Sequence, residues 1–299
     1  MESVLAPSSA LAAGGDVLAL TKPRVTGVVL ATAATGIFLA PGHPGGLLVA
    51  ATLAGTALVV GAANALNCWM EREADARMER TRRRPLAAGR LSPGAGLAAG
   101  AGFAAAGLAV LLAFAGPLPA LLAALALAGY VWVYTPLKTR TPKALLAGAV
   151  PGALPPLIGW TAVTGRIGRP GLWLFLVLFL WQLPHFLAIT LCLQDDYARG
   201  GFKVLPLVKG EAAARRHLLL YTALLVPASL AATPLGLAGR GYLAVAAAAG
   251  IVFLAWASSG LRPSSLSAAT RRWAGGLFAY SILYLLVLSG ALLLDATHG

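Results

Sequence analysis

The chain has 299 residues, of which 59% are hydrophobic and only 11% are charged, and its mean hydropathy is +0.79. This composition excludes a water-soluble globular domain and is typical of a protein that crosses a membrane several times. A net charge of +13 would suggest nucleic-acid binding in a soluble protein, but here the basic residues lie between long apolar segments, so we interpret them as determinants of membrane orientation and expect no nucleic-acid partner.

The amino-terminal segment lacks the features of a cleaved targeting signal. Residues 1–17 contain small residues that resemble a cleavage site, but no basic segment and apolar run precede them. We therefore expect a retained, flexible tail over residues 1–17 and a single membrane domain over residues 18–299. Cys68 and Cys192 both lie in apolar stretches, so we interpret them as packing residues rather than as a disulfide or a thiolate metal site.

Nine segments are long and apolar enough to be transmembrane helices, because a helix needs about 20 residues to cross the hydrocarbon core. Their centres lie near Thr32, Leu58, Ala104, Leu125, Ala153, Leu178, Leu224, Ala247 and Leu285. We therefore predict an all-α polytopic membrane protein with nine transmembrane helices.

The distribution of positive charge orients these helices. A cytoplasmic amino terminus leaves only three of the 23 Lys and Arg residues outside, at Arg166, Arg169 and Arg240, as the positive-inside rule requires. Nine helices then place the carboxyl terminus on the opposite face. The second and sixth helices run in the same direction, so the acidic residues that follow them are expected at the same cytoplasmic face.

The first acidic group follows the second helix. Asn67, Glu71 and Asp75 recur every four residues, so a helix that continues through them would line them up in one stripe about 12 Å long. Mg²⁺ takes carboxylate and amide oxygens together with water and phosphate oxygens. Carboxylates at the end of a membrane helix are usually functional. The spacing therefore predicts a metal site, with an ordinary solvated loop as the alternative.

Basic residues follow this stripe directly. Arg80 and Arg84 share a second four-residue spacing, and a guanidinium group matches phosphate oxygens bidentately. Acidic residues for a metal next to arginines for phosphate indicate a site for a diphosphate. For each arginine taken alone, a loop that only sets the membrane topology is an equally good interpretation.

The second acidic group ends the sixth helix. Asp195 and Asp196 are expected to hold a second metal on the opposite side of the same diphosphate, because two metals neutralise the charge that develops as diphosphate leaves. The two residues are adjacent and cannot both point along one helical face. We interpret Lys203 and Lys209, which follow, as topology signals rather than ligand contacts.

Two further features lie between and within these regions. Lys138 and Arg140 belong to a proline-stiffened basic loop, and we expect them to reach the phosphates, with a charged connector as the alternative. His185 lies about ten residues deeper in the membrane than Asp195. Intramembrane ionisable groups are usually functional, so we predict that His185 orients an acceptor or relays a proton rather than serving as a core residue.

Several segments together resemble a known family. In chain order they are NxxxExxxD, MERTRRRPL, YTPLKTRTPKALLAGAVPGALPPLIGW, and PHF with DDY and LP. They resemble the UbiA-type intramembrane aromatic prenyltransferases over residues 18–295. The first segment is typical of the whole superfamily, whereas MERTRRRPL and GALPPLIGW with PHF are typical of the branch that farnesylates haem.

The resemblance implies nine helices around a central cavity that opens to lipid, with two Mg²⁺ ions bridging a prenyl diphosphate. It also implies roles for residues of this sequence: Asn67, Glu71, Asp75, Asp195 and Asp196 on metal and diphosphate, Arg80, Arg84 and Lys138 on diphosphate, and His185 in haem handling or catalysis. The sequence departs from the family pattern at Gln194, where a basic residue is common, and at Lys203 and Val204, where a Pro-Met pair is common.

The function implied by the resemblance is farnesyl transfer from farnesyl diphosphate to a vinyl group of haem B, with addition of water, giving haem O. The expected location is the cytoplasmic (inner) membrane, among membrane lipids, with haem A synthase or oxidase assembly proteins as partners. Prenylation of a quinone precursor or another lipid aromatic is an alternative, because it needs the same diphosphate site. A non-catalytic haem or lipid transporter is an alternative of another class.

Overall fold

The computed structural model describes residues 10–261 and 267–296, and every regular element within them is a helix. The α-helices are α1 Ala10–Leu20, α2 Pro23–Leu39, α3 Gly46–Met70, α4 Arg72–Arg77, α5 Pro93–Val110, α6 Pro117–Ala128, α7 Thr135–Leu137, α8 Ala144–Thr164, α9 Arg169–Cys192, α10 Gln194–Arg199, α11 Leu205–Lys209, α12 Glu211–Leu230, α13 Arg240–Ser259 and α14 Ser267–Ala296. Two π-helical segments, η1 Leu111–Ala115 and η2 Gly129–Tyr134, extend α5 and α6.

The described residues contain seven helices that are long and apolar enough to cross a membrane. A bent pair, Gly14–Leu20 and Pro23–Leu39, makes eight if it counts as one span. The remaining predicted span, around Leu224, forms the 20-residue helix α12, but Glu211 and two arginines in its first turns make it less apolar than the others. The all-helical membrane architecture is confirmed, whereas the count of nine is not.

Part of the segment that we expected to be a flexible tail is helical. Helix α1 starts at Ala10, and residues 1–9 lie outside the described residues. Asp16 on this helix accepts hydrogen bonds from Nε of Arg90, at 3.1 and 3.0 Å, and Leu20 at the end of the helix is fully buried. An ion pair in the middle of α1 and an apolar anchor at its end thus dock the helix against the domain.

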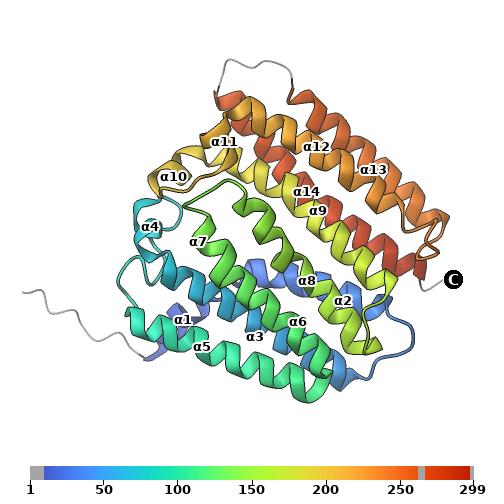
Figure 1. The fold of residues 1–299 in the computed structure, drawn as a ribbon, viewed down its shortest axis with the longest axis horizontal. Coiled ribbons are helices and arrows are strands. Elements are labelled where there is room, and N and C mark those ends of the chain that lie inside the picture. Colours follow the sequence, from blue (N-terminus) through green and yellow to red (C-terminus); the bar gives the residue numbers. More distant parts are fainter. Residues whose placement is uncertain (1–9, 262–266, 297–299) are drawn as a thin grey trace, which may run out of the picture.

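Close helix packing depends on small residues in the middle of the molecule. Figure 1 shows α12, α13 and α14 on one side, α3, α5 and α6 on the other, and α2, α8 and α9 between them. A side chain at Gly36 on α2 would overlap the backbone of Pro156, and one at Gly159 on α8 would overlap that of Ala33. These glycines allow α2 and α8 to approach closely, as small residues do in membrane helix pairs.

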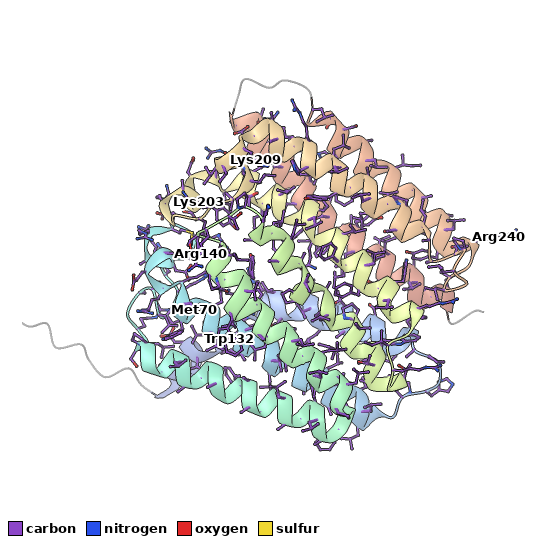
Figure 2. The ribbon with its side chains drawn as sticks, in the orientation of Figure 1. Met70, Trp132, Arg140, Lys203, Lys209 and Arg240 are labelled. Carbon is purple, nitrogen blue, oxygen red and sulfur yellow. The ribbon has the colours of Figure 1, made fainter. Side chains whose placement is uncertain are left out.

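The short helices α4, α7, α10 and α11 gather at one end of the molecule (Figure 1). Figure 2 shows Arg140, Lys203 and Lys209 at this end and Arg240 at the opposite end. The backbone N–H of Gly239 donates a hydrogen bond to Asp295, so the last turn of α14 lies beside Arg240. The acidic and basic groups singled out in the sequence therefore lie at the end away from the last turn of α14.

Candidate functional site

The acidic stripe spans a break between two helices. Helix α3 ends at Met70, and Glu71, with φ −96° and ψ 7°, separates it from α4, so the expected single straight helix is wrong in this detail. The four-residue connection survives the break, because Glu71 N–H donates to Asn67 O at 2.9 Å and Asp75 N–H donates to Glu71 O at 2.7 Å. All three side chains are buried, with exposed fractions of 2% for Asn67, 9% for Glu71 and 1% for Asp75.

Glu71 forms an ion pair with Lys138, which lies in the basic loop after α7. The Lys138 ammonium also lies 4.8 Å from the ring centroid of Tyr134 and 5.4 Å from that of Phe202. The backbone N–H of Lys203 donates to Lys138 O at 2.7 Å, which joins the segment before α11 to this loop. The basic loop and the first acidic group are therefore in direct contact, and the role of Lys138 toward a diphosphate stays a prediction.

Asp75 is paired with an arginine of the segment that follows it. Arg84 Nη1 donates to both carboxylate oxygens, at 2.9 and 2.7 Å, and the Thr81 hydroxyl donates to the Asp75 carbonyl at 3.0 Å. Burial alone would lower the pKa of Arg84, but the Asp75 carboxylate beside it outweighs burial and raises that pKa above its ordinary value. Arg84 is thus a permanent cation next to the acidic stripe.

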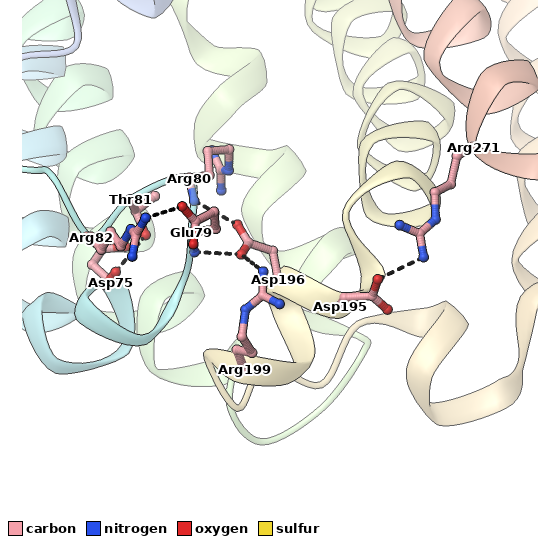
Figure 3. Close-up of polar contacts among 9 residues, drawn as sticks. All are labelled: Asp75, Glu79, Arg80, Thr81, Arg82, Asp195, Asp196, Arg199 and Arg271. Carbon is pink, nitrogen blue, oxygen red and sulfur yellow. Dashed lines mark hydrogen bonds and ion pairs between the residues drawn. The ribbon is translucent and has the colours of Figure 1, made fainter. Parts of the chain in front are cut away.

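Asp196 joins the second acidic group to the first. Its carboxylate accepts hydrogen bonds from the backbone N–H groups of Glu79 at 2.7 Å and Arg80 at 3.2 Å, and from Arg199 at 2.6 Å (Figure 3). Burial alone would raise the pKa of Asp196, but these three donors outweigh burial and hold the pKa below its ordinary value of 3.8. An ionised carboxylate of α10 therefore lies against the turn that carries the arginines.

Asp195 lies apart from this cluster. Its side chain is 62% exposed, and it accepts a hydrogen bond of 2.7 Å from Arg271 on α14, in the direction away from Asp196 (Figure 3). Successive residues of a helix point about 100° apart, so only one of the two aspartates faces the first acidic group. The prediction that both line a metal site is not supported for Asp195.

Arg80 and Arg140 are both exposed at this end of the molecule. The Arg80 guanidinium lies 6.0 Å from the ring centroid of Tyr197, and Figure 2 shows Arg140 beside the segment that contains Lys203. Neither guanidinium forms an ion pair with an acidic residue in the described part of the chain. Their roles toward a diphosphate stay predictions.

His185 lies in the interface between α9 and α14. Its Nδ1 atom is 2.7 Å from the Ser281 hydroxyl, and its ring stacks between Trp181 and Phe278, with centroid distances of 4.6 and 4.5 Å. These contacts separate His185 from the acid–arginine cluster. The structure therefore does not bring His185 together with the other predicted site residues.

Two residues at the site, Lys22 and Thr135, were not predicted from the sequence. Lys22 donates a hydrogen bond of 3.2 Å to Asn67 Oδ1, and Asn67 Nδ2 donates one of 3.2 Å to the Thr135 hydroxyl. Lys22 precedes the first long apolar segment, where a basic residue is also expected for topology alone. Thr135 carries no signal in the sequence, because its role depends on contact between α3 and the start of α7.

A cavity opens beside the Glu71–Lys138 pair. Aromatic and aliphatic side chains form most of its wall, together with two lysines. The residues that line the cavity include Tyr134, Lys138, Leu145, Phe186, Leu187, Thr190, Tyr197, Phe202 and Lys203. Its empty volume is about 550 Å³, part of it open to the exterior. The cavity therefore combines apolar walls with positive charge next to the acidic stripe.

The carboxylates of the cluster are each paired with a cation. Among the described residues, no three His, Cys, Asp or Glu side chains lie close enough to hold a metal ion. The donors themselves fit Mg²⁺, because carboxylate and amide oxygens are its preferred protein ligands. Asn67, Glu71, Asp75 and Asp196 offer oxygen donors of this kind from buried positions.

Comparison with known proteins gives a family match and relatives that align over nearly the whole chain. A model described as the UbiA prenyltransferase family matches residues 29–283. A "Protoheme IX farnesyltransferase" from Anaeromyxobacter sp. (strain Fw109-5) is 51% identical over 294 residues, which are 98% of both chains. The protein of the same name from Myxococcus xanthus (strain DK1622) is 46% identical over 280 residues, which are 94% of both chains.

Solved structures share the fold. A digeranylgeranylglyceryl phosphate synthase superposes with a TM-score of 0.79 at 17% identity, covering 95% of this chain and 99% of the other. A UbiA homologue from Archaeoglobus fulgidus bound to GPP and Mg²⁺ superposes with a TM-score of 0.66 at 16% identity, covering 92% and 99%. At these identities the structures bear on the fold alone. From the family match and the sequence relatives together, this chain belongs to the UbiA prenyltransferase family.

Proposed function

We propose that this chain transfers a farnesyl group from farnesyl diphosphate to a vinyl group of haem B, with addition of water, giving haem O and diphosphate. The observation that carries the proposal is the set of buried carboxylates at one end of the molecule, each paired with a lysine or an arginine: Glu71 with Lys138, Asp75 with Arg84, and Asp196 with Arg199. Relatives about half identical over nearly the whole chain bear the name of this activity and so support this choice of substrates.

The acidic residues would hold Mg²⁺. Asn67, Glu71, Asp75 and Asp196 are the candidate ligands, and the bound metal would neutralise charge on the diphosphate. Asp195 belongs to this group only if α10 rotates, because its carboxylate faces Arg271. The likeness to a homologue described as bound to GPP and Mg²⁺ favours the same ligand class here.

The basic residues would stabilise the leaving diphosphate. In the structure, Arg84 forms an ion pair with Asp75, and Lys138 forms one with Glu71. If these carboxylates held Mg²⁺, Arg84 and Lys138 would be available to donate to phosphate oxygens, and Arg80 and Arg140 would add positive charge at the rim. Cations that meet the leaving group where its charge develops lower the barrier to breaking the allylic C–O bond.

The apolar cavity would hold the prenyl chain. Its largely apolar walls match the prenyl chain, and a chain bound there would displace water and so protect a reactive allylic cation from premature capture. The rings of Tyr134 and Phe202 already face the Lys138 ammonium, and the same ring faces would stabilise a carbocation. The terminal vinyl carbon of haem would form a bond to this cation, which leaves the positive charge on the inner vinyl carbon. Water would add to that carbon and lose a proton, which gives the new hydroxyl group.

We place the site at the cytoplasmic face of the inner membrane. The excess of Lys and Arg at the end that carries Arg140, Lys203 and Lys209 supports this orientation (Figure 2). The last turn of α14, next to Gly239, would then lie at the opposite face. Haem A synthase and oxidase assembly proteins are the partners that such a product would require.

The proposal is tested by expressing the gene in a host that lacks its own haem farnesylating enzyme. We expect haem O in membrane extracts by mass spectrometry, and none from the empty host. A prenylated hydroxybenzoate or naphthoate without haem O would show that the acceptor is a quinone precursor. Absence of Mg²⁺-dependent diphosphate release from purified protein would contradict an enzymatic role altogether.

A further inference from the structure

Lys22 has an unusual backbone conformation at the elbow between α1 and α2. The two helices meet at 51°, and Lys22 has φ 50° and ψ 66°. Among the described residues it is the one non-glycine residue with positive φ. The left-handed region is unfavourable for a lysine, and such conformations persist at functional sites where surrounding contacts impose them.

Contacts from α3 impose this conformation. The Asn64 side chain donates a hydrogen bond of 3.1 Å to the Thr21 carbonyl, which also accepts one of 2.9 Å from the Thr26 hydroxyl. A side chain at Gly61 would come within 3.2 Å of the Thr21 methyl group, so glycine lets the elbow lie close to α3. The elbow is thus held against one face of α3, and this directs the Lys22 side chain toward Asn67.

The orientation of the Asn67 amide follows from its partners. The Thr135 hydroxyl donates its only proton to the Tyr130 carbonyl, at 2.9 Å, so its oxygen accepts from Asn67 Nδ2. Asn67 Oδ1 consequently faces Lys22, whose ammonium is a donor only. Lys22 therefore stands at one end of the acidic stripe, at the residue nearest the membrane interior.

Lys22 differs from the three ion-paired cations of the site in the charge of its partner. Lys138, Arg84 and Arg199 each pair with a carboxylate. Within the described part of the chain, the Lys22 side chain hydrogen-bonds to the neutral Asn67 amide. An ammonium group has three donors, so a partly buried cation at this place is suited to an anionic partner that the protein itself does not supply.

We propose that Lys22 is a diphosphate-binding residue: its ammonium donates to a diphosphate oxygen at the Asn67 end of the site, opposite the arginines. This inference rests on the proposed function, because it assumes that a prenyl diphosphate is the ligand. The strained elbow serves to bring this cation from the first membrane segment to the end of the second. A role limited to orienting the Asn67 amide is the alternative that the experiment must separate.

The test measures binding of inorganic diphosphate and of farnesyl thiodiphosphate to the full-length protein in nanodiscs, by calorimetry, with Mg²⁺ and with EDTA. The variants are Lys22→Gly and Lys22→Asn, which suit the left-handed backbone but lack the charge, and Lys22→Arg, which keeps it. Arg24→Gln is the matched control, since it removes an exposed positive charge two residues away.

We expect Lys22→Gly and Lys22→Asn to fold at least as stably as the wild type and to lose diphosphate affinity about 10-fold or more, in EDTA as well as in Mg²⁺, because a hydrogen bond to a charged group is lost. Lys22→Arg and Arg24→Gln should bind within about threefold of the wild type.

Wild-type affinity in Lys22→Gly overturns the inference. A loss confined to Mg²⁺ also overturns it, since that indicates an effect through Asn67 alone. Wild-type protein that binds diphosphate but makes no haem O contradicts the proposed function and leaves this inference standing.

Discussion

Asp196 on α10 accepts a hydrogen bond of 2.7 Å from the backbone N–H of Glu79, which lies 117 residues earlier in the chain. The second oxygen of the carboxylate accepts from the next N–H, that of Arg80. One side chain therefore fixes the position of α10 relative to the turn that presents Arg80 and leads to Arg84. This contact joins the end of α9 and α10 to the segment that follows α4.

The neighbouring aspartates allow a matched test of this arrangement. We expect Asp196→Asn to lower the rate of haem O formation about 100-fold or more, because a buried charged oxygen next to the diphosphate is lost. Asp195→Asn should stay within about fivefold of the wild type, because its exposed ion pair with Arg271 contributes little. Rates are measured in membranes that contain equal amounts of folded protein. Equal losses in the two variants would contradict the separation of their roles.

The acid dependence of stability provides a second test of Asp196. Its folded-state pKa lies below the ordinary value of 3.8, so its stabilising contribution is complete above that value and is lost as pH falls through the folded pKa. We expect the amide protons of Glu79 and Arg80 to lose exchange protection in this acidic range.

The control is Asp196→Asn, which has no carboxylate to protonate. Its protection at these two amides should be low at every pH and should not change across the acidic range. Protection is measured by hydrogen–deuterium exchange in detergent. Wild-type protection that persists well below pH 3.8 is consistent with the lowered pKa of Asp196. The same pH dependence in Asp196→Asn would show that another group is responsible.

Much of this organisation follows from the sequence, but the directions of individual side chains do not. The four-residue spacing of Asn67, Glu71 and Asp75 predicts their common face, and backbone hydrogen bonds preserve it across the break at Glu71. The break itself carries no local signal. Asp195 and Lys22 depend on contacts between helices distant in sequence, with α14 and α3 respectively. Tertiary contacts of this kind are absent from a periodic pattern.

The number of membrane spans is predicted less well than the helices themselves. The apolar stretch around Leu224 predicts a helix, and α12 is indeed helical over 20 residues. Its first turns carry Arg215, which donates to Glu211 at 2.9 Å and to the Thr270 hydroxyl at 2.5 Å. Charge at one end of a helix lowers its mean hydropathy without preventing burial of that end against α14. A count based on length and mean hydropathy therefore omits α12, although its polar end packs against α14.

Single and double variants of the Asp75–Arg84 pair should affect stability and activity differently. We expect Asp75→Asn to destabilise the protein by about 3 kcal/mol, because the largely buried Arg84 loses its carboxylate partner. The double variant Asp75→Asn with Arg84→Gln should recover much of this stability, since no unpaired charge remains. It should not recover activity, because both the proposed metal ligand and the proposed phosphate contact are gone.

This prediction is checked by thermal unfolding in detergent and by haem O formation in the same preparations. Arg82→Gln is a suitable control, because Arg82 pairs with Glu79 at the exposed surface and its loss should leave the unfolding temperature nearly unchanged. If the double variant is as unstable as Asp75→Asn, the pairing of these two charges is not the source of the destabilisation.

Removal of metal should abolish turnover without unfolding the protein. In EDTA we expect no diphosphate release, with recovery on addition of Mg²⁺, while Glu71, Asp75 and Asp196 remain neutralised by Lys138, Arg84 and Arg199. Mg²⁺ and farnesyl thiodiphosphate together should raise the unfolding temperature, because ligand at 100 times its Kd stabilises a folded protein by about 2.7 kcal/mol. Either ligand alone should give a smaller rise. Full activity after exhaustive chelation would exclude the proposed metal site.

His185 is best tested by a substitution that preserves its packing. The Ser281 hydroxyl donates to the Phe278 carbonyl at 2.6 Å, so His185 Nδ1 carries the proton of the hydrogen bond between them, and Nε2 keeps a free lone pair. His185→Phe retains a ring between Trp181 and Phe278 and leaves the Ser281 hydroxyl paired.

If His185 handles the haem acceptor, this variant should bind farnesyl thiodiphosphate like the wild type but form haem O at least about 10-fold more slowly, since one acid–base or ligand group typically contributes 10²–10⁴-fold. The measurement is haem O formation at saturating prenyl diphosphate over a range of haem B concentrations. Unchanged kinetics in a folded His185→Phe variant would assign this histidine to the packing of α9 against α14.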